Sequence, residues 1–343
     1  MLEWKLIRLG DICITNKNSY SSKDNWKFVN YLDTGSLTEN KITELQYINI
    51  ETDKIPSRAR RKVIKNSILY STVRPNQLHY GIIKEPVDNL LVSTGFTVID
   101  VDINKAIPEF VYYLLTQNNT TEQLQAIAEQ SVSTYPCIKP SDIENLEFKL
   151  PNLIIQNKIV SILDTIDSKI CQNEKINKNL EQQAQVIFLK MFPDIFSASA
   201  SSSFQNLIEF SNGKKRPETI GDIPVYGGNG VLAYTNQSNA ENCVIIGRVG
   251  AYCGNTFLCP EKCWTSDNAI QAKSKNEASP LFIYYLLRNA SLPSRHIGTG
   301  QPLMTQAILN AIPVNEPSIQ EIKSFINICT PLHETIFANE KQN

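Results

Sequence analysis

A short set of charged residues before Pro151 has the composition of a nuclease site. Asp142 is followed by Glu147-Phe148-Lys149, and two carboxylates beside a lysine can hold a metal ion next to a phosphate. The corresponding stretch in a second, similar half of the chain has Leu309 and Val314-Asn315. A metal site built on two similar domains would not lose its ligands in one of them. The set therefore argues only weakly for a nuclease.

A run of cations is the next group that could do chemistry. Residues 54–65 contain no acid and carry Lys54, Arg58, Arg60, Arg61, Lys62 and Lys65. Cations gathered on one face can contact phosphates, although a solvated loop or strand edge has the same composition. The net charge of the whole chain is −1, so there is no overall attraction to nucleic acid.

Four of the eight cysteines lie close together in the sequence. Cys243, Cys253, Cys259 and Cys263 form no Cys-x-x-Cys pairs and have no neighbouring histidine, which disfavours a zinc site. Buried thiols that act as small apolar side chains are the favoured interpretation. We expect no bound metal.

Other catalytic motifs are missing from the sequence. There is no Gly-x-x-x-x-Gly-Lys-Ser/Thr loop, and none of the histidines stands in a nucleophile–base pattern. No apolar run approaches the roughly 18 residues that span a bilayer, and the N-terminus lacks the apolar segment of a signal peptide. We expect a cytoplasmic protein without a membrane segment that catalyses nothing by itself.

The chain contains an internal repeat. The segment FVYYLL at residues 110–115 returns as FIYYLL at residues 282–287. Three other pairs follow in the same order: residues 6–9 with 207–210, 66–70 with 242–246, and Pro151 with Ile155-Gln156 against Pro317 with Ile319-Gln320. So long a period indicates a duplicated domain rather than a solenoid.

Each copy mixes strand and helix patterns. Residues 67–70, 96–99 and 243–246 are rich in β-branched and aromatic residues, which is typical of strands. Residues 108–118 and 280–289 begin with proline and continue as helices. The two copies are therefore predicted to be compact α+β units.

Between the copies the pattern changes to one long helix. Residues 152–192 contain no proline or glycine, and apolar residues recur every three or four positions. Lys169, Asn173 and Asn177 interrupt that stripe, and polar residues at such positions fix helix register. At 1.5 Å per residue the helix would be about 60 Å long.

The segments that follow complete the domain organisation. Residues 197–203 are a serine and alanine run typical of a linker, and residues 319–339 restart the helical pattern, much shorter than the first helix and interrupted at Pro331. We expect this second helix to run antiparallel to the first and to cover only part of it, which leaves apolar surface for a protein partner. The predicted boundaries are 1–150, 151–192, 193–203, 204–314 and 315–343.

This arrangement resembles the specificity subunit of type I restriction–modification enzymes. The most specific stretch is LPNLIIQNKIVSILD at residues 150–164, which resembles the junction between a target recognition domain and its long spacer helix; residues 173–181 are similar to the middle of that helix. Residues 71–75 with 92–96, and residues 247–250 with 264–269, resemble parts of two known types of recognition domain. The likeness covers the chain except for an apparently shortened C-terminus.

The resemblance implies an α+β fold with two target recognition domains separated by long coiled-coil helices. Each domain would read one half of a split double-stranded DNA target, and the helices would set the gap. Methylation subunits that carry S-adenosylmethionine would pack on the helices, and a restriction–translocase subunit would join them. This chain would itself bind no cofactor, and a shortened C-terminus would leave room for self-association.

For DNA contacts we select residues by chemistry, since bidentate donors and amides read bases while cations and hydroxyls contact phosphates. The phosphate candidates are Arg58, Arg60, Arg61, Lys62, Lys214, Lys215 and Arg216. The groove candidates are Arg74, Asn76, Gln77, His79, Asn229, Tyr234, Arg248, Tyr252 and Asn255. The candidates for partner contacts on the long helix are Ile159, Ile162, Ile166, Ile176, Leu180 and Ile187.

Two alternatives stay open at this point. One is a stand-alone DNA nuclease, which rests on Asp142, Glu147 and Lys149. The other is an adaptor whose duplicated domains bind proteins. The tyrosines of the FVYYLL and FIYYLL helices are expected in the cores rather than as platforms for base stacking.

Overall fold

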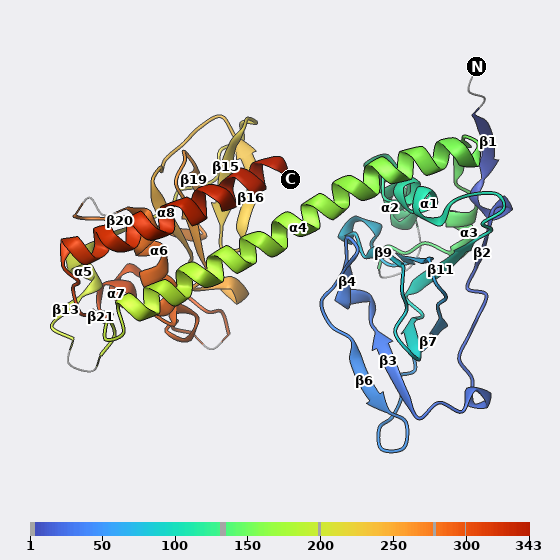
Figure 1. Ribbon diagram of the computed structural model, residues 1–343, viewed down its shortest axis with the longest axis horizontal. Coiled ribbons are helices and arrows are strands. Elements are labelled where there is room, and N and C mark those ends of the chain that lie inside the picture. Colours follow the sequence, from blue (N-terminus) through green and yellow to red (C-terminus); the bar gives the residue numbers. More distant parts are fainter. Residues whose placement is uncertain (1–3, 131–134, 198–199, 277–278, 299) are drawn as a thin grey trace. The chain divides into compact units, whose positions relative to one another are not determined.

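A computed structural model describes residues 4–130, 135–197, 200–276, 279–298 and 300–343 (Figure 1). The chain divides into two compact units, Met1–Asp167 and Ser168–Asn343. Each unit contains one copy of the repeat and its own portion of a long helix, α4 (Leu153–Met191). No helix among the described residues is both long and apolar enough to cross a membrane.

The first unit is built on two four-stranded sheets. The order β2-β11-β8-β9 joins Cys13–Thr15, Phe96–Val101, Ser67–Ser71 and Tyr80–Ile83, all antiparallel. The order β6-β3-β10-β7 joins Gln46–Asn49, Phe28–Leu32, Leu90–Ser93 and Ala59–Lys62, with β3 and β10 parallel. Two short ladders pair β1 (Lys5–Arg8) with β12 (Glu147–Leu150) and β4 (Leu37–Thr38) with β5 (Lys41–Ile42). The helices are α1 (Pro108–Leu115), α2 (Asn118–Glu129) and α3 (Pro140–Glu144).

The second unit repeats this topology. The order β14-β20-β17-β18 joins Ile208–Asn212, Ala269–Ser274, Cys243–Gly247 and Thr256–Cys259, again all antiparallel. The order β16-β15-β19 joins Gly230–Thr235, Ile223–Gly227 and Trp264–Thr265, with β15 and β19 parallel. A ladder pairs β13 (Ser202–Ser203) with β21 (Pro313–Val314). The remaining helices are α5 (Phe204–Leu207), α6 (Pro280–Asn289), α7 (Gln306–Asn310) and α8 (Ile319–Gln342).

The predicted duplication and α+β class are therefore confirmed. The repeated FVYYLL and FIYYLL segments form α1 and α6, and the strand patterns at 67–70 and 243–246 form β8 and β17. Each of these two strands is preceded by an asparagine with positive φ, Asn66 at 65° and Asn242 at 50°. Asparagine tolerates this left-handed conformation better than most residues. Both repeats therefore have the same asparagine-containing turn immediately before this strand.

The central strand of each unit is buried on both faces. In β8, Ile68 and Tyr70 pack with α1, whereas Leu69 packs toward the second sheet. In β17, Val244 packs with α6, whereas Ile245 packs toward the other side. Because successive side chains of a strand point to opposite faces of the sheet, one run of apolar residues contributes to two hydrophobic cores.

One predicted pairing within the repeat is wrong. The backbone N–H of Leu9 donates to Leu146 O, and that of Phe204 donates to Ile312 O, both at 2.9 Å. Leu9 and Phe204, both fully buried, are therefore equivalent, so residues 6–9 do not match 207–210. The two segments share apolar residue types, but Leu6 lies 64% exposed on β1.

The Ile-Gln match beside the two prolines is also wrong, by two positions. Asn152 and Ser318 accept the first backbone bonds of α4 and α8, which makes Gln156 equivalent to Ile322. Gln156 is fully buried: its Oε1 accepts from Ile107 N–H at 2.8 Å, and its Nε2 donates to Pro151 O at 2.8 Å. The side chain ties α4 to the start of α1.

The serine-rich segment is not entirely a linker. Ser202 and Ser203 form β13, and Asn315 holds the preceding loop by donating to Asp194 O at 2.8 Å and to Ser197 Oγ at 2.9 Å. Ala198 and Ser199 lie outside the described residues. Composition alone predicted a linker here because serine carries no strand signal, and the pairing comes from β21, far along the chain.

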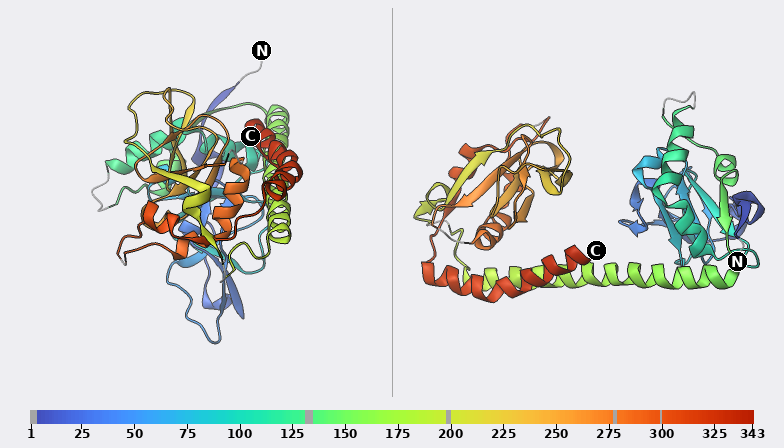
Figure 2. Two further views of the ribbon diagram at one scale, coloured as in Figure 1. Left: turned by 90° about the vertical axis from the view of Figure 1, so that its left-hand side faces the viewer. Right: turned by 90° about the horizontal axis from the view of Figure 1, so that it is seen from above.

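In the second unit α8 lies antiparallel along α4, as predicted (Figures 1 and 2). Two asparagines of α4 bridge the helices: Asn173 Nδ2 donates to Asn343 Oδ1 at 2.9 Å, and Asn177 Oδ1 accepts from Asn339 Nδ2 at 2.8 Å. Asn173 and Asn177 are the polar residues that interrupt the apolar pattern of this helix in the sequence. They pair α4 and α8 in one register.

Pro331 does not break α8, contrary to the prediction. The helix continues from Ile319 to Gln342 with Pro331 inside it. A proline in a helix interior costs about 3 kcal/mol, and burial of side chains on both sides of it opposes that cost. The buried residues are Ile322, Phe325, Cys329, His333 and Ile336.

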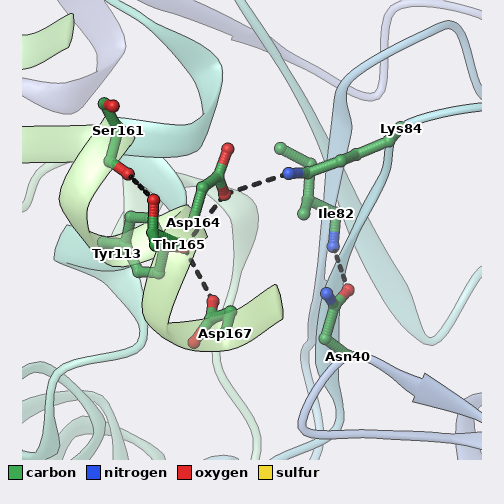
Figure 3. Close-up of polar contacts among 8 residues, drawn as sticks. All are labelled: Asn40, Ile82, Lys84, Tyr113, Ser161, Asp164, Thr165 and Asp167. Atoms are coloured by element: carbon green, nitrogen blue, oxygen red, sulfur yellow. Dashed lines mark hydrogen bonds and ion pairs between the residues drawn. The ribbon is translucent and has the colours of Figure 1, made fainter. Parts of the chain in front are cut away.

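A tyrosine of each repeated helix fixes its unit to α4. In the first unit Tyr113 OH donates to Asp164 at 3.1 Å and to Asp167 at 2.7 Å, and Lys84 pairs with Asp164 at 3.0 Å (Figure 3). In the second, Tyr285 OH contacts His333 Nε2 at 2.9 Å, and Phe188 of α4 stacks on its ring with centroids 6.1 Å apart. Tyr112, Tyr284 and Tyr285 are buried in the cores, as predicted, whereas Tyr113 is only partly buried.

Candidate nucleic-acid interface

Three segments meet beyond the end of β8 in the first repeat. The N–H of Thr72 donates to Gly95 O at 2.8 Å, and Ile138 N–H donates to Thr72 O at 2.8 Å. Arg74 N–H then donates to Pro136 O at 3.0 Å. The loop after β8, the turn between β10 and β11, and the chain before α3 thus form one hydrogen-bonded construction, which we call the loop frame.

The second repeat has the same loop frame. The N–H of Arg248 donates to Asn268 O at 3.0 Å, and Met304 N–H donates to Arg248 O at 2.8 Å. Gly250 N–H donates to Pro302 O at 3.0 Å. Arg248 therefore corresponds to Thr72, and Gly250 corresponds to Arg74. The same three backbone hydrogen bonds thus present different side chains in the two repeats.

In the first repeat the frame exposes a group of polar side chains at η4 (Pro75–Gln77). Arg74, Asn76 and Gln77 are exposed, and the Arg74 guanidinium lies over the ring of Tyr135 at 5.2 Å. Stacking on an aromatic ring orients a guanidinium while leaving its edge free to donate. Tyr135 was not among the predicted residues; an aromatic next to Pro136 is a weak signal because its partner is 61 positions away.

His79 does not belong to this exposed group. Its half-buried ring has Nδ1 2.7 Å from Leu37 O and 3.0 Å from the hydroxyl of Thr38. These contacts hold β4 against β9. The role of His79 in base contact stays a prediction, but the structure gives the ring a place inside the domain.

The basic run forms β7, an edge strand, and the residues around it. Arg58 O accepts from Thr94 N–H at 2.8 Å, which places Arg58 beside the β10–β11 turn of the loop frame. Arg58 and Arg60 are exposed, whereas Arg61 is half-buried and burial lowers its pKa. Lys62 is also half-buried: it is ion-paired with Asp24 and lies 5.3 Å from the Trp26 ring. Lys65 is ion-paired with Glu85 at 2.6 Å. Lys54, Arg58 and Arg60 are thus the exposed cations of this run that form no ion pair within the described part of the chain.

Four groove candidates of the second repeat gather around Gly247. A Cβ there would come within 2.8 Å of Gly228 O, so only glycine lets the β15–β16 turn, which contains Asn229, approach the end of β17. Tyr252 is 48% exposed in η5 (Gly250–Tyr252), and Asn255 accepts from Gly247 N–H through its carbonyl at 2.8 Å. Arg248 is half-buried, and its Nη1 donates to Asp267 O at 3.4 Å.

The cations of the second repeat lie near the same loop. Lys214 N–H donates to Thr265 O at 3.0 Å, and the indole of Trp264 donates to Lys214 O at 3.3 Å. Lys214, Lys215 and Arg216 are exposed. Tyr234 lies elsewhere: it pairs with Pro224 at the end of β16 that is remote from the β15–β16 turn, and it lines a separate cavity.

The six selected residues of α4 divide into two groups. Ile159 and Ile187 pack against the cores of their units, and Leu180 is half-buried. Ile162, Ile166 and Ile176 are 63%, 50% and 46% exposed. Exposed apolar residues repeated along a helix mark a surface for protein contact, which agrees with the predicted partner helix without testing the partner.

The acidic and cysteine sets do not assemble into metal sites. The Asp142 carboxylate accepts from Lys139 N–H at 2.7 Å, as a cap of α3, while Glu147 and Lys149 are exposed on β12. The four neighbouring cysteines are buried, as predicted. For Cys243, the hydrogen bond with Cys259 and burial raise the pKa to about 12, which keeps the thiol protonated. No group of metal-binding side chains occurs among the described residues.

With this geometry established, comparison with known proteins decides the family. The type I restriction modification DNA specificity domain matches residues 1–182 and 205–343. The chain belongs to this family. The predicted resemblance is thereby confirmed for both copies of the repeat.

Two curated members of the specificity family are similar to part of the chain. The type I restriction enzyme HindI specificity subunit of Haemophilus influenzae is 36% identical over 196 residues, 57% of this chain and 42% of that protein. The MjaIX specificity subunit of Methanocaldococcus jannaschii is 25% identical over 196 residues, 55% of this chain and 43% of that protein. The matched regions thus span less than half the length of these relatives.

One solved structure of the specificity family supports the same fold, and a second is reported beside it. The type I restriction-modification S subunit from M. genitalium aligns over 99% of this chain and 92% of its own, with a TM-score of 0.52 and 17% identity. The HsdS subunit from Thermoanaerobacter tengcongensis aligns over 98% and 91%, with a TM-score of 0.45 and 18% identity. Because the sequence identity is only 17%, the similarity to the M. genitalium structure supports the fold alone.

Proposed function

We propose that this chain is the sequence-specific DNA-binding subunit of a type I restriction–modification system. Each repeat reads one half of a bipartite duplex target. The observation that carries the proposal is the loop frame, built with the same backbone bonds around Thr72 and Arg248. One construction used twice suits two similar tasks on one ligand.

The different side chains on the two frames suit two different half-sites. In the first repeat Arg74 offers a guanidinium oriented by Tyr135, with Asn76 and Gln77 beside it. Arginine reads guanine, and asparagine or glutamine reads adenine, by pairs of hydrogen bonds in the major groove. In the second repeat Asn229 of the β15–β16 turn and Tyr252 of η5 are exposed, and Arg248 is half-buried. The target should therefore be asymmetric.

Phosphate contacts come from cations next to each frame. Arg58 and Arg60 serve the first repeat, and Lys214, Lys215 and Arg216 serve the second. Such contacts position a domain on the duplex without specifying sequence. With a net charge of −1, the chain supplies only part of the neutralisation that stable DNA binding requires, so further cations must come from partner subunits.

The long helix α4 is the proposed contact surface for partner subunits. Exposed Ile162, Ile166 and Ile176 on α4 are the contact surface for methylation subunits, which contribute S-adenosylmethionine and the catalytic groups. A restriction–translocase subunit completes the assembly. In this proposal the chain performs no catalysis and binds no cofactor itself.

Selection from a random duplex pool tests the proposal. The purified chain with its methylation subunit should enrich a motif of two short blocks separated by a fixed gap. Enrichment of one continuous block would contradict the division of reading between repeats. If the complex forms but retains no duplex, the adaptor alternative replaces this function.

A further inference from the structure

The turn between β19 and β20 is a part of the second loop frame that the predicted DNA contacts did not include. Its outermost residues, Asp267 and Asn268, are both exposed. Asn268 O accepts the same frame hydrogen bond as Gly95 O in the first repeat, so Asp267 corresponds to Thr94. The second repeat therefore has a carboxylate at a position where the first repeat has a neutral hydroxyl.

Two neighbouring segments hold this turn in place. On one side, Arg248 N–H donates to Asn268 O at 3.0 Å, within the loop frame. On the other side, Lys214 N–H donates to Thr265 O at 3.0 Å. A contact residue that its own domain already holds in place loses less conformational freedom on binding. The turn thus presents the Asp267 side chain from a fixed backbone.

The guanidinium of Arg248 ends at the same turn. Its Nη1 donates to the main-chain oxygen of Asp267 at 3.4 Å, and its Nε is buried without a hydrogen-bond partner among the described residues. Arg248 is half-buried and forms no ion pair in the described part of the chain. A charge that is partly removed from water costs free energy unless it is paired. The fold thus holds this cation at the frame without supplying its partner.

The carboxylate of Asp267 also forms no ion pair with any described residue. DNA phosphates repel a carboxylate, so its place on a DNA-reading frame needs a compensating contact. Aspartate accepts a hydrogen bond from N4 of cytosine in the major groove. Adenine also has a donor there, N6, but its N7 acceptor lies beside that donor and repels a carboxylate. Cytosine is therefore the base that Asp267 fits.

We propose that Arg248 and Asp267 together read one G·C base pair in the second half-site. The major-groove edge of that pair presents two acceptors, N7 and O6 of guanine, beside one donor, N4 of cytosine. A guanidinium beside a carboxylate offers the complementary set of donors and acceptors. The inference rests on the proposed DNA-binding function and names a base pair that the target must contain.

Selection from a random duplex pool, with the methylation subunit present, tests the inference. For the wild type we expect a bipartite motif, and the half-site that Arg74→Gly leaves unaffected should contain an invariant G·C pair. A bipartite motif without such a pair would overturn the inference and leave the proposed function standing. If no bipartite motif is enriched, the proposed function fails, and the inference fails with it.

Asp267→Thr puts the residue of the first repeat on the same turn, so the frame should keep its fold. Discrimination against other base pairs at that position should fall about tenfold, the size of one base contact. Affinity for duplexes of unrelated sequence should hold or rise, because a negative charge is removed. A uniform loss of affinity would instead make Asp267 a structural residue and overturn its base contact. Asp222→Thr, at an exposed position directly before β15, should change neither property.

Arg248→Lys tests whether the two side chains read the same base pair. Lysine keeps the positive charge but lacks the two-donor fork of a guanidinium. The preference for guanine should fall about tenfold, at the base pair where Asp267→Thr loses discrimination. If the two variants alter different base pairs, or if Arg248→Lys alters none, the joint reading of one G·C pair is overturned.

Discussion

Arg74 and Gly250 occupy the same backbone position in the two repeats. Both have positive φ, 48° and 75°, and each donates its N–H to the carbonyl of a proline, Pro136 or Pro302, at 3.0 Å. Glycine adopts this conformation freely, whereas an arginine there costs roughly 1 kcal/mol. The first repeat has an arginine at this strained position, and its guanidinium is held over Tyr135, which supports the proposal that Arg74 contacts a base.

Arg74→Gly should therefore remove a base contact without disturbing the loop. The second repeat already shows that glycine fits this frame. In the complex with the methylation subunit, affinity for a duplex with an intact first half-site should fall about tenfold or more, since a bidentate base contact is worth about 1–3 kcal/mol. Competition binding with duplexes altered in one half at a time measures this.

The control for that variant is Lys149→Ala, which removes an exposed cation of β12. It should leave the preference between half-sites unchanged. Equal loss at both half-sites on Arg74→Gly would contradict the assignment of Arg74 to the first half.

Gln156→Leu should loosen the junction between the first repeat and α4. The substitution leaves Ile107 N–H without its acceptor at the start of α1, and an unpaired buried group costs about 1–3 kcal/mol. Amide exchange at Ile107 should accelerate roughly tenfold or more, on the scale where 1.4 kcal/mol is tenfold, and the melting temperature of the first unit should fall. Gln320→Leu, at an exposed position of α8, should do neither. Similar behaviour of the two variants would refute the structural role of Gln156.

Asn177 and Asn339 should show energetic coupling. Removal of either side chain breaks the hydrogen bond between α4 and α8. In a double-mutant cycle with Asn177→Ala and Asn339→Ala, urea unfolding should give a coupling free energy of about 1 kcal/mol. Asn179→Ala, on the exposed side of α4, should add independently to Asn339→Ala. A coupling free energy of zero would mean that this hydrogen bond does not fix the register of the two helices.

His333 should make the second unit less stable in mild acid. Burial lowers its pKa, with smaller opposed effects of Glu181 and Arg288. The unfolded chain, in which histidine titrates near 6.5, then binds more protons than the folded chain. Stability is lost as pH falls below about 6.5 toward the lowered folded pKa, by at most about 1.4 kcal/mol per pH unit.

His333→Gln should remove that component of the pH dependence. Urea unfolding of the wild type and the variant between pH 7.5 and 5.5 measures the difference. If the two profiles are parallel, the histidine is not the titrating group.

The fold was predictable from local patterns, but several contacts were not. The Phe-x-Tyr-Tyr-Leu-Leu helices and the strands at 67–70 and 243–246 carry their own periodicity, so both repeats could be found in the sequence. The alignment of the two repeats was mispredicted where unrelated positions share a residue type, as at Leu6 and Leu207. β13 is made of two serines and exists only because β21 pairs with it.

Some elements of the candidate site could be found in the sequence and others could not, while the DNA contacts of all these residues stay predictions. Motifs near Arg74 and Arg248 stand out because they are short and local, and the structure joins each to the turn before β11 or β20. Tyr135 was missed because it reaches Arg74 from a remote segment. Lys62 was selected by charge alone, and its pairing with Asp24 depends on a loop fold that the sequence does not display.

The most direct test is a map of methylated bases across a genome in cells that express this chain with its methylation subunit. The proposed function predicts a motif of two unlike blocks at a fixed spacing, because the two loop frames carry different side chains. A palindromic motif would contradict it, since identical halves require one repeat to be used twice.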